Sequence, residues 1–184
     1  MQEPDQQINT ALSSADLHNP AEKMLDAERD VQARLGDRPI DFEANRAISN
    51  IYRAAASVRR QAERGLLKDY GLSWGGFTIL WVLWVWGEME TASLATECDL
   101  AKGTLTGMLT TLEKRDLVER SRSKTDGRRV LVSATGTGVD MIDELFPKFN
   151  QLETGLVSGL SNDESMELSR LLRLVITNSS PTED

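Results

Sequence analysis

The chain has 184 residues, of which 40% are hydrophobic and 27% charged, and its formal net charge is −8. These values are typical of a soluble globular protein with one domain of ordinary size, or one domain and an extra arm. A single cysteine, Cys98, excludes an intrachain disulfide, and a single histidine, His18, excludes a histidine-rich metal site. Because His18 lies alone in a polar segment, a Ser-His-Asp triad is set aside as well.

Two further features concern the compartment of the protein. The most apolar run, Trp74 to Trp86, is shorter than the ~20 residues that a membrane span needs, so we expect a buried helix there. The N-terminus is acidic and polar and has no apolar core after a basic start. We therefore expect no signal peptide and a cytoplasmic protein.

Charge is distributed unevenly along the chain. The net charge is −6 over residues 1–45 and again over 136–184, zero over 46–101, and +4 over 102–135. Since phosphate contact depends on the local field, the basic stretch keeps nucleic-acid binding open despite the acidic total. On charge alone, a solvated basic loop explains this stretch equally well.

The N-terminal part predicts two helices. Residues 1–18 are polar and show no period, which indicates a disordered tail. Asn19 and Pro20 are typical of an N-cap and a first helical residue, so we expect a helical arm over residues 19–40 whose helix ends near Gly36. Asp41 opens a longer helix that ends near Tyr70, and its apolar stripe is Ala44, Ala47, Ile48, Ile51, Ala55, Val58 and Ala62.

The middle of the chain predicts three helices and a hairpin. Ser73 caps a helix that stops at Gly87, and a short helix follows over 92–98 with Thr91 as its N-cap. After a tight break another helix runs over 102–115. The β-type runs 117–122 and 129–133 then flank an Asp-Gly turn, which is a hairpin signature. Helix, turn, helix and hairpin in this order predict a winged helix-turn-helix.

The C-terminal part predicts two more helices. Thr135 caps a long helix whose apolar positions extend from Val139 to Leu160, and Pro147 predicts a kink or a break inside it. Ser161 and Glu164 match a capping box that starts the last helix. That helix is lined by Leu168, Leu171, Leu172 and Val175, and residues 179–184 form a tail.

The helix over 102–115 has two faces of different chemistry. Four apolar residues recur at helical spacing and are expected to face the core: Leu105, Met108, Leu109 and Leu112. The opposite face carries Gly103, Gly107, Thr110 and Lys114, flanked by Thr106 and Thr111. Glycine costs roughly 1 kcal/mol inside a helix relative to alanine. Small side chains nevertheless let a helix approach a DNA groove closely, and threonine can bond to bases or phosphates. The alternative is a set of merely tolerated surface residues.

The hairpin concentrates positive charge in Arg120, Arg122, Lys124, Arg128 and Arg129. Asp126 precedes Arg128 by two residues, and a carboxylate there can orient the guanidinium through a charge-assisted pair. An arginine held in this way can enter the narrow, negative minor groove of DNA. The hairpin is therefore a candidate DNA-binding wing.

Several short motifs follow one another over residues 71–138. They are Gly71-Leu72-Ser73, Leu94-Ala95, Gly103-Thr104-Leu105-Thr106, the run from Leu112 to Arg120, and a wing pattern D-x-R-x-x-x-V-x-L-T-x-x-G from Asp126 to Gly138. Ala134 replaces the leucine of that pattern. In this order the motifs resemble the MarR family of bacterial regulators, and the flanking helices extend the resemblance to about residues 40–178. Ala101 in place of a frequent serine cap, Pro147 and the long arm of residues 1–40 depart from the family.

This resemblance implies a mainly α fold with a small β-wing, assembled as an intertwined homodimer. It implies a winged-helix DNA-binding domain over residues 71–135 and a helical dimerisation region over 41–70 and 136–178. The function it implies is that of a transcription regulator, more often a repressor, which binds a pseudo-palindromic operator in double-stranded DNA. It further implies a pocket for small aromatic acids or similar effectors. Trp74 and Trp81 are our candidates to line it, and Arg46 or Arg53 to meet a ligand carboxylate.

The residues that we predict to contact DNA come from both parts of the motif: Thr91, Lys102, Gly103, Thr104, Thr106, Gly107, Thr110, Lys114, Arg122, Lys124, Asp126, Arg128 and Arg129. The main alternative is a winged-helix module that binds another protein and not DNA. An enzyme is disfavoured because no phosphate loop, metal-ligand cluster or nucleophile–base set occurs, and we expect no cofactor and no metal ion. We expect Cys98 to be a buried thiol rather than a redox sensor.

Overall fold

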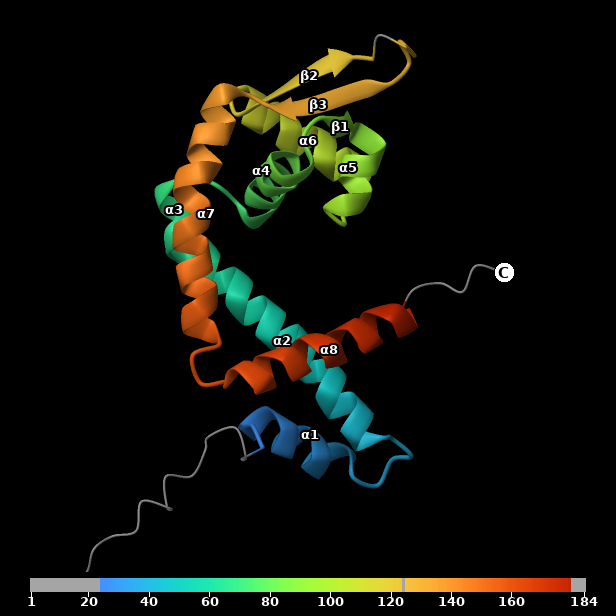
Figure 1. Ribbon diagram of the computed structural model, residues 1–184. Coiled ribbons are helices and arrows are strands. Elements are labelled where there is room, and N and C mark those ends of the chain that lie inside the picture. The colour runs from blue at the N-terminus through green and yellow to red at the C-terminus, as the bar shows by residue number, and fades with distance from the viewer. Residues whose placement is uncertain (1–23, 124, 180–184) are drawn as a thin grey trace, which may run out of the picture. The chain divides into compact units, whose positions relative to one another are not determined.

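The computed structural model describes residues 24–123 and 125–179. The chain divides into two units, Met1–Arg53 and Ala54–Asp184. In chain order the elements are α1 (Asp26–Leu35), α2 (Phe42–Arg64), α3 (Leu66–Asp69), α4 (Trp74–Trp86), β1 (Met89–Glu90), α5 (Thr91–Glu97), α6 (Lys102–Glu113), β2 (Val118–Arg122), β3 (Val130–Ala134), α7 (Gly136–Leu156) and α8 (Asn162–Ser179) (Figure 1). The predicted mainly α fold with a small β-wing is confirmed.

The second unit contains the predicted helix-turn-helix and hairpin. β2 and β3 pair antiparallel from Val118 opposite Ala134 to Arg122 opposite Val130. The short strand β1 pairs with the other edge of β3, which places β3 at the centre of a three-stranded sheet. The hairpin projects beside α5 and α6 (Figure 1). β1 escaped prediction because a strand of two residues has no period to detect.

The core of the second unit forms around α4. This helix is apolar on all sides, and Ile79 and Leu80 are fully buried in it. α6 contributes Leu105, Leu109 and Leu112 to the same core, so the predicted inner face of α6 is confirmed. The wing is joined to this core through Val132, which is fully buried on β3. Burial of this continuous apolar surface fixes α6 and the wing on one scaffold.

Three of the predicted helix caps are present. The Ser73 hydroxyl accepts from the Gly76 amide at 3.2 Å, and the Thr135 hydroxyl accepts from the Gly138 amide at 3.1 Å. Ser161 and Glu164 bond reciprocally, as a capping box requires. Thr91 is not the N-cap of α5. It is the first residue of that helix, and Glu90 takes the cap position without a side-chain hydrogen bond.

Two predicted helix boundaries near the N-terminus are wrong. Met24 and Leu25 are not helical, so α1 begins at Asp26 and not at Pro20; Asn19 and Pro20 themselves lie outside the described residues. The long helix that was expected to reach Tyr70 stops at Arg64, and a separate short helix, α3, follows. Gly65 separates the two helices with ψ −106°, a backbone conformation that an α-helix does not contain.

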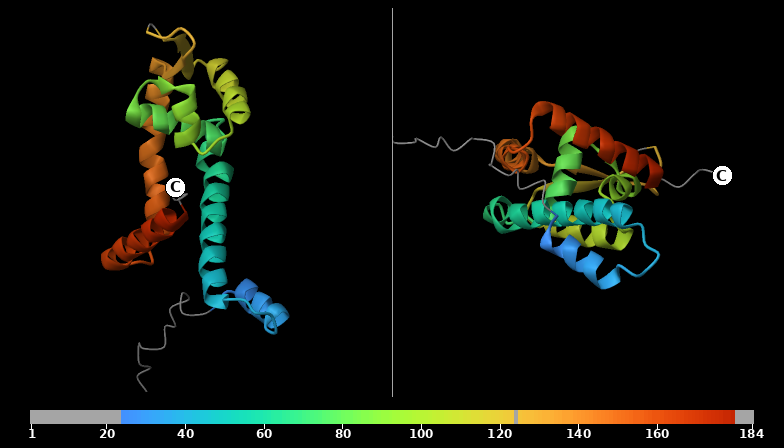
Figure 2. Two further views of the ribbon diagram at one scale, coloured as in Figure 1. Left: turned by 90° about the vertical axis from the view of Figure 1, so that its right-hand side faces the viewer. Right: turned by 90° about the horizontal axis from the view of Figure 1, so that it is seen from below.

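Pro147 does not break α7. The helix runs from Gly136 to Leu156 as one element, although Pro147 has no N–H to offer to the Asp143 carbonyl four residues before it (Figure 2). Asp143 is exposed, so water can satisfy this carbonyl. Leu160 lies beyond the end of the helix. Within the described residues, no helix combines the length and the apolar character needed to cross a bilayer.

Candidate DNA-binding face and effector pocket

The outer face of α6 is open to solvent. Seven predicted DNA-contacting residues of α6 and its C-cap are exposed: Lys102, Gly103, Thr104, Thr106, Gly107, Thr110 and Lys114. A Cβ atom added at Gly103 or Gly107 would have no described atom within 4 Å. Packing within the chain therefore does not require glycine at either position, and an external body can approach the helix backbone closely there.

The threonines on α6 use their hydroxyl protons within the helix. The Thr106 hydroxyl donates to the Lys102 carbonyl at 2.9 Å, Thr110 to the Thr106 carbonyl at 3.0 Å, and Thr111 to the Gly107 carbonyl at 3.2 Å. What remains on each side chain is a methyl group and an oxygen that can still accept. These groups suit a base pair that offers a thymine methyl and an adenine N6 donor in the major groove.

Arg120 ties the wing to the recognition helix α6. Its Nε donates to Glu113 Oε1 at 2.8 Å, its Nη2 also binds Glu113 Oε2, and the same nitrogen lies 3.5 Å from Thr110 Oγ1. The Arg120 guanidinium holds the pKa of the Glu113 carboxyl below its usual value, so the pair stays charged near neutral pH. Arg120 also borders a groove of about 320 Å³ between α5, α6 and the wing, together with Thr91, Lys102 and Thr106.

The tip of the wing holds one carboxylate against two arginines. Asp126 Oδ1 accepts from the Arg128 amide at 3.1 Å and from Arg128 Nε at 3.3 Å, which is the expected orienting pair. These bonds hold the pKa of Asp126 below its ordinary value, and Arg129, 3.4 Å from Asp126 Oδ2, adds to the effect. Arg129 also donates to Glu90 at 2.5 Å. The Arg128 side chain remains 93% exposed, so its charge faces solvent. Arg122 is exposed, whereas Lys124 lies outside the described residues.

Two polar anchors fix the C-terminal end of α6, and the sequence did not predict either of them. Arg115 donates to the backbone carbonyls of Tyr70 and Gly71 at 2.7 and 2.6 Å, which joins the end of α6 to the turn before α4. On the other side, Thr137 donates to Asp116 Oδ2 at 3.1 Å. A Cβ at Gly138 would collide with the Leu117 carbonyl, which explains why the wing pattern ends in glycine. The anchors hold α6 at a fixed angle on the scaffold.

An aromatic pocket of about 270 Å³ lies between α4 and α7. Trp74 and Trp81, the two predicted effector-pocket residues, both line it, so the structure brings them together as expected. Phe77, Phe146 and Phe149 supply the other rings of its wall. Trp84 and Trp86 are exposed and do not belong to its lining, and their rings pack at its margin, 5.4 Å from Phe146 and 5.7 Å from Trp81.

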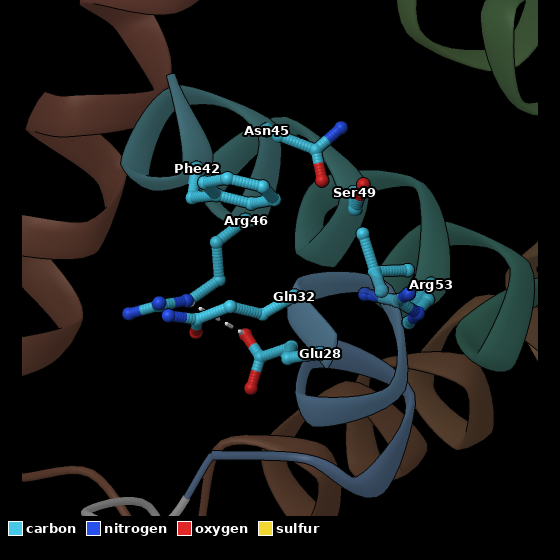
Figure 3. Close-up of a pocket in the computed structure, with 8 residues that line it drawn as sticks. Glu28, Gln32, Phe42, Asn45, Arg46, Ser49 and Arg53 are labelled. Atoms are coloured by element: carbon cyan, nitrogen blue, oxygen red, sulfur yellow. Dashed lines mark ion pairs between the residues drawn. The ribbon is translucent and has the colours of Figure 1, made fainter. Parts of the chain in front are cut away.

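Arg46 and Arg53 lie elsewhere, in the first unit. Both line a small pocket around the buried side chain of Glu28 on α1 (Figure 3). Glu28 accepts from the Asn50 amide at 2.7 Å, and Arg46 Nε lies 4.0 Å from it. The Asn50 and Leu25 bonds, with the charges of both arginines, hold the pKa of Glu28 below its ordinary value. In this unit the arginines balance the charge of Glu28.

Cys98 is buried at the end of α5, as predicted. Burial, with a smaller contribution from the charge of Glu97, raises its pKa to about 11. The group is therefore a neutral thiol near pH 7, and it lacks the thiolate character that redox-sensing cysteines have.

Comparison with known proteins agrees with this architecture. A model of the MarR family matches residues 72–130. The uncharacterized HTH-type transcriptional regulator YwaE of Bacillus subtilis is 38% identical over 154 residues, which cover 82% of this chain and 90% of YwaE. A solved structure of mutant MarR from E. coli complexed with operator DNA has a TM-score of 0.62 and 25% identity, over 69% of this chain and 91% of that one. NadR in complex with 4-hydroxyphenylacetate has a TM-score of 0.60 and 25% identity, over 68% and 89%.

These similarities do not favour the alternative of a winged-helix module that binds only protein, because the family and its relatives are DNA-binding regulators. They also set aside an enzymatic role. With its open recognition helix, its arginine-bearing wing and its relatives taken together, the chain belongs to the MarR family of DNA-binding transcription regulators.

Proposed function

We propose that the protein is a cytoplasmic, homodimeric repressor that a small effector releases from its operator. The winged-helix domain over residues 71–135 binds DNA, and residues 41–70 and 136–178 form the dimerisation region. Two copies of α6 enter successive major grooves of a pseudo-palindromic site about one helical turn apart. The observation that carries this proposal is the division of α6 into a buried leucine side and an open glycine–threonine side.

Each predicted contact residue has a role in this arrangement. Gly103 and Gly107 let the backbone of α6 approach the bases, and Thr104, Thr106 and Thr110 contact base edges or nearby phosphates. Lys102, Lys114 and Thr91 bind phosphates beside the groove. Arg128 enters the minor groove while Asp126 orients it. Arg122, Lys124 and Arg129 contact the flanking backbone.

The proposed dimer rests on apolar surface that the chain does not cover itself. Leu168 and Leu171 on α8 are 43% and 45% exposed, and no residue of α8 is buried. At the end of α7 and in the turn after it, Leu156, Val157 and Leu160 are exposed as well. Apolar side chains grouped on one element in this way are typical of a protein–protein interface. A second copy of the chain, which offers the same surface, is the occupant that we propose.

The aromatic pocket between α4 and α7 is the proposed effector site. Trp74 and Trp81 are the residues that we propose to contact the ligand, and NadR provides a precedent for a single-ring ligand in a protein of this fold. Ligand binding between the helices would change the distance between the two copies of α6 and so weaken DNA binding. Arg46 and Arg53, predicted to meet a ligand carboxylate, line the pocket around Glu28 and are not part of the lining of the proposed effector site.

A DNA-binding titration tests the proposal. The dimer is first used to select its site from a random pool of duplexes, and binding to the selected site is then measured between 50 and 300 mM salt. We expect a linear fall of the logarithm of affinity with the logarithm of salt, with a slope of about −0.9 for each phosphate contact. A slope near zero, or a pool from which no sequence is enriched, would contradict the proposed contacts.

A further inference from the structure

Among the residues that the structure describes, the aromatic pocket has one charged side chain in its lining, and that side chain is acidic. Five rings and Glu153 form most of its wall, and no lysine, arginine or histidine of the described ranges belongs to the lining. A pocket for an aromatic acid would need a cation or several N–H donors facing the carboxylate, because an unpaired anion loses its hydration on binding. The wall instead carries a carboxylate, which would repel the carboxylate of an aromatic acid.

The rings form a nearly continuous π surface. Phe149 lies 4.5 Å from Phe77 and 6.1 Å from Trp74, measured between ring centroids. On the other side of the pocket Phe146 lies 6.5 Å from Trp81 at an interplanar angle of 27°. The faces of such rings are electron-rich and attract a cation within about 6 Å, most strongly at tryptophan. Cages of this kind are suited to quaternary ammonium groups.

The charge of Glu153 is available to a ligand. Its Oε2 accepts from the Asn150 amide at 2.9 Å, and it forms no ion pair with any residue of the described ranges. The nearest basic side chain on its own helix, Lys148, is already bound to Glu144 and to the Tyr70 hydroxyl, both at 2.6 Å. Arg59 on α2, one residue from the pocket-lining Val58, is paired with Glu63 at 3.4 Å. α7 also carries the acidic Asp140 and Asp143, so its local field favours a positive ligand.

We propose that the effector of this protein is a small organic monocation with a single ring, held by the aromatic wall and by Glu153. This inference rests on the proposed function, because it identifies the ligand class of the proposed effector site. A volume of about 270 Å³ accommodates one ring and a trimethylammonium group. The geometry thus replaces the aromatic acid that the family resemblance implied with a ligand of opposite charge.

The test compares three single-ring probes on the full-length dimer: benzyltrimethylammonium, neutral benzyl alcohol and anionic phenylacetate. Binding is followed by calorimetry and by quenching of tryptophan fluorescence. We expect the cation to bind about five- to thirty-fold more tightly than either other probe. Saturating cation should also weaken binding to the selected DNA site in a mobility-shift assay.

Two substitutions assign this preference to the pocket. Glu153→Gln should lower the affinity for the cation about five- to ten-fold and leave the affinity for benzyl alcohol unchanged, because only the charged ligand interacts with the carboxylate. Asp140→Asn is the matched control, since it removes the same charge from the same helix outside the pocket. Phenylacetate binding as tightly as the cation, equal effects of both substitutions, or no binding of the cation at millimolar concentration would each overturn the proposal. DNA binding without ligand is measured in parallel, and its absence would instead contradict the proposed function.

Discussion

α6 and α8 are both amphipathic helices with leucines along one side, but the chain treats them differently. On α6, Leu105, Leu109 and Leu112 are buried, and the polar side faces solvent. On α8, Leu168, Leu171 and Leu174 are exposed, Leu172 is half-buried, and no residue is buried. The same kind of pattern is thus buried within the chain on α6 and left open to solvent on α8. The apolar side of α6 is buried within one chain, whereas the apolar side of α8 is left open for the partner that we propose.

This difference corresponds to the division between DNA binding, which involves α6, and the proposed dimerisation, which involves α8. The scaffold under α6 holds the helix by a core, by Arg115 on the Tyr70 and Gly71 carbonyls, and by Arg120 on Glu113. A fixed recognition surface results, which DNA binding requires. In the dimer that we propose, the spacing between two such surfaces depends on elements such as α8, which pack against the second copy.

The largest expected effect comes from breaking α8. Leu168→Asp combined with Leu171→Asp should abolish the dimer and weaken specific DNA binding at least ~100-fold, because each buried leucine contributes about 1.5–3 kcal/mol and each new carboxylate must be desolvated. Light scattering after gel filtration measures the assembly, and fluorescence anisotropy measures the affinity. Since both leucines are exposed within one chain, the helical circular dichroism of the winged-helix part should persist.

The control for α8 places the same charges on its other side. Ser169→Asp combined with Thr177→Asp adds two carboxylates to exposed positions of α8 outside the leucine stripe. This variant should remain dimeric. If the leucine variant is also dimeric, the exposed leucines of α8 do not form the dimer interface.

The next effect concerns the wing. Arg128→Ala should reduce specific affinity by roughly 1–3 kcal/mol, about five- to 150-fold, because it removes a charge that is exposed yet oriented by Asp126. Anisotropy titrations on the selected duplex measure the loss. Arg34→Ala on α1 removes another exposed charge outside the winged helix and should change affinity less than two-fold. Equal effects of the two substitutions would mean that the wing contributes only unspecific charge.

The sequence predicted the parts of the fold that follow from periodicity and local capping. The leucine spacing of α6, the caps at Ser73, Thr135 and Ser161 and the turn at Asp126 are all local signals, and all are present. What escaped prediction depends on contacts between distant segments. β1 exists only because β3 lies beside it, and the bonds of Arg115 join positions 44 and 45 residues apart.

The functional residues likewise divide into those that local sequence could predict and those that it could not. The exposed side of α6 could be deduced from residue type, because glycine and threonine at those positions have no role in a core. Trp74 and Trp81 could be assigned to one pocket by their shared helical face. The charge of that pocket could not be predicted, because Glu153, which lines it, lies more than seventy residues after Trp74 and Trp81 in the chain.

A smaller effect on affinity, with an opposite effect on stability, is expected at the centre of α6. Gly107→Ala should raise the free energy of unfolding by roughly 1 kcal/mol, which corresponds to about 2–4 °C in Tm, because alanine is the better helix former and its Cβ meets no described atom. The same Cβ should weaken DNA binding about five-fold by preventing close approach. Thermal denaturation and anisotropy measure the two effects. A variant that is stabilised and binds DNA normally would contradict the glycine–threonine side as the contacting surface.

The smallest effect is expected at Cys98, which lies on the buried side of the same scaffold. With a pKa of about 11 instead of 9.0, the folded protein holds roughly a hundred-fold less thiolate at pH 8 than the unfolded chain, so a thiol reagent should react correspondingly slowly until denaturant is added. Because burial favours the neutral thiol, its contribution to stability is complete below pH 9 and falls as the pH rises from 9 towards 11. Cys98→Ala should therefore leave DNA affinity within two-fold, before and after peroxide treatment. If peroxide changes the DNA affinity of the unsubstituted protein but not that of Cys98→Ala, the core under α6 must open to solvent. The contrast between a buried apolar side of α6 and an exposed one of α8 would then be contradicted.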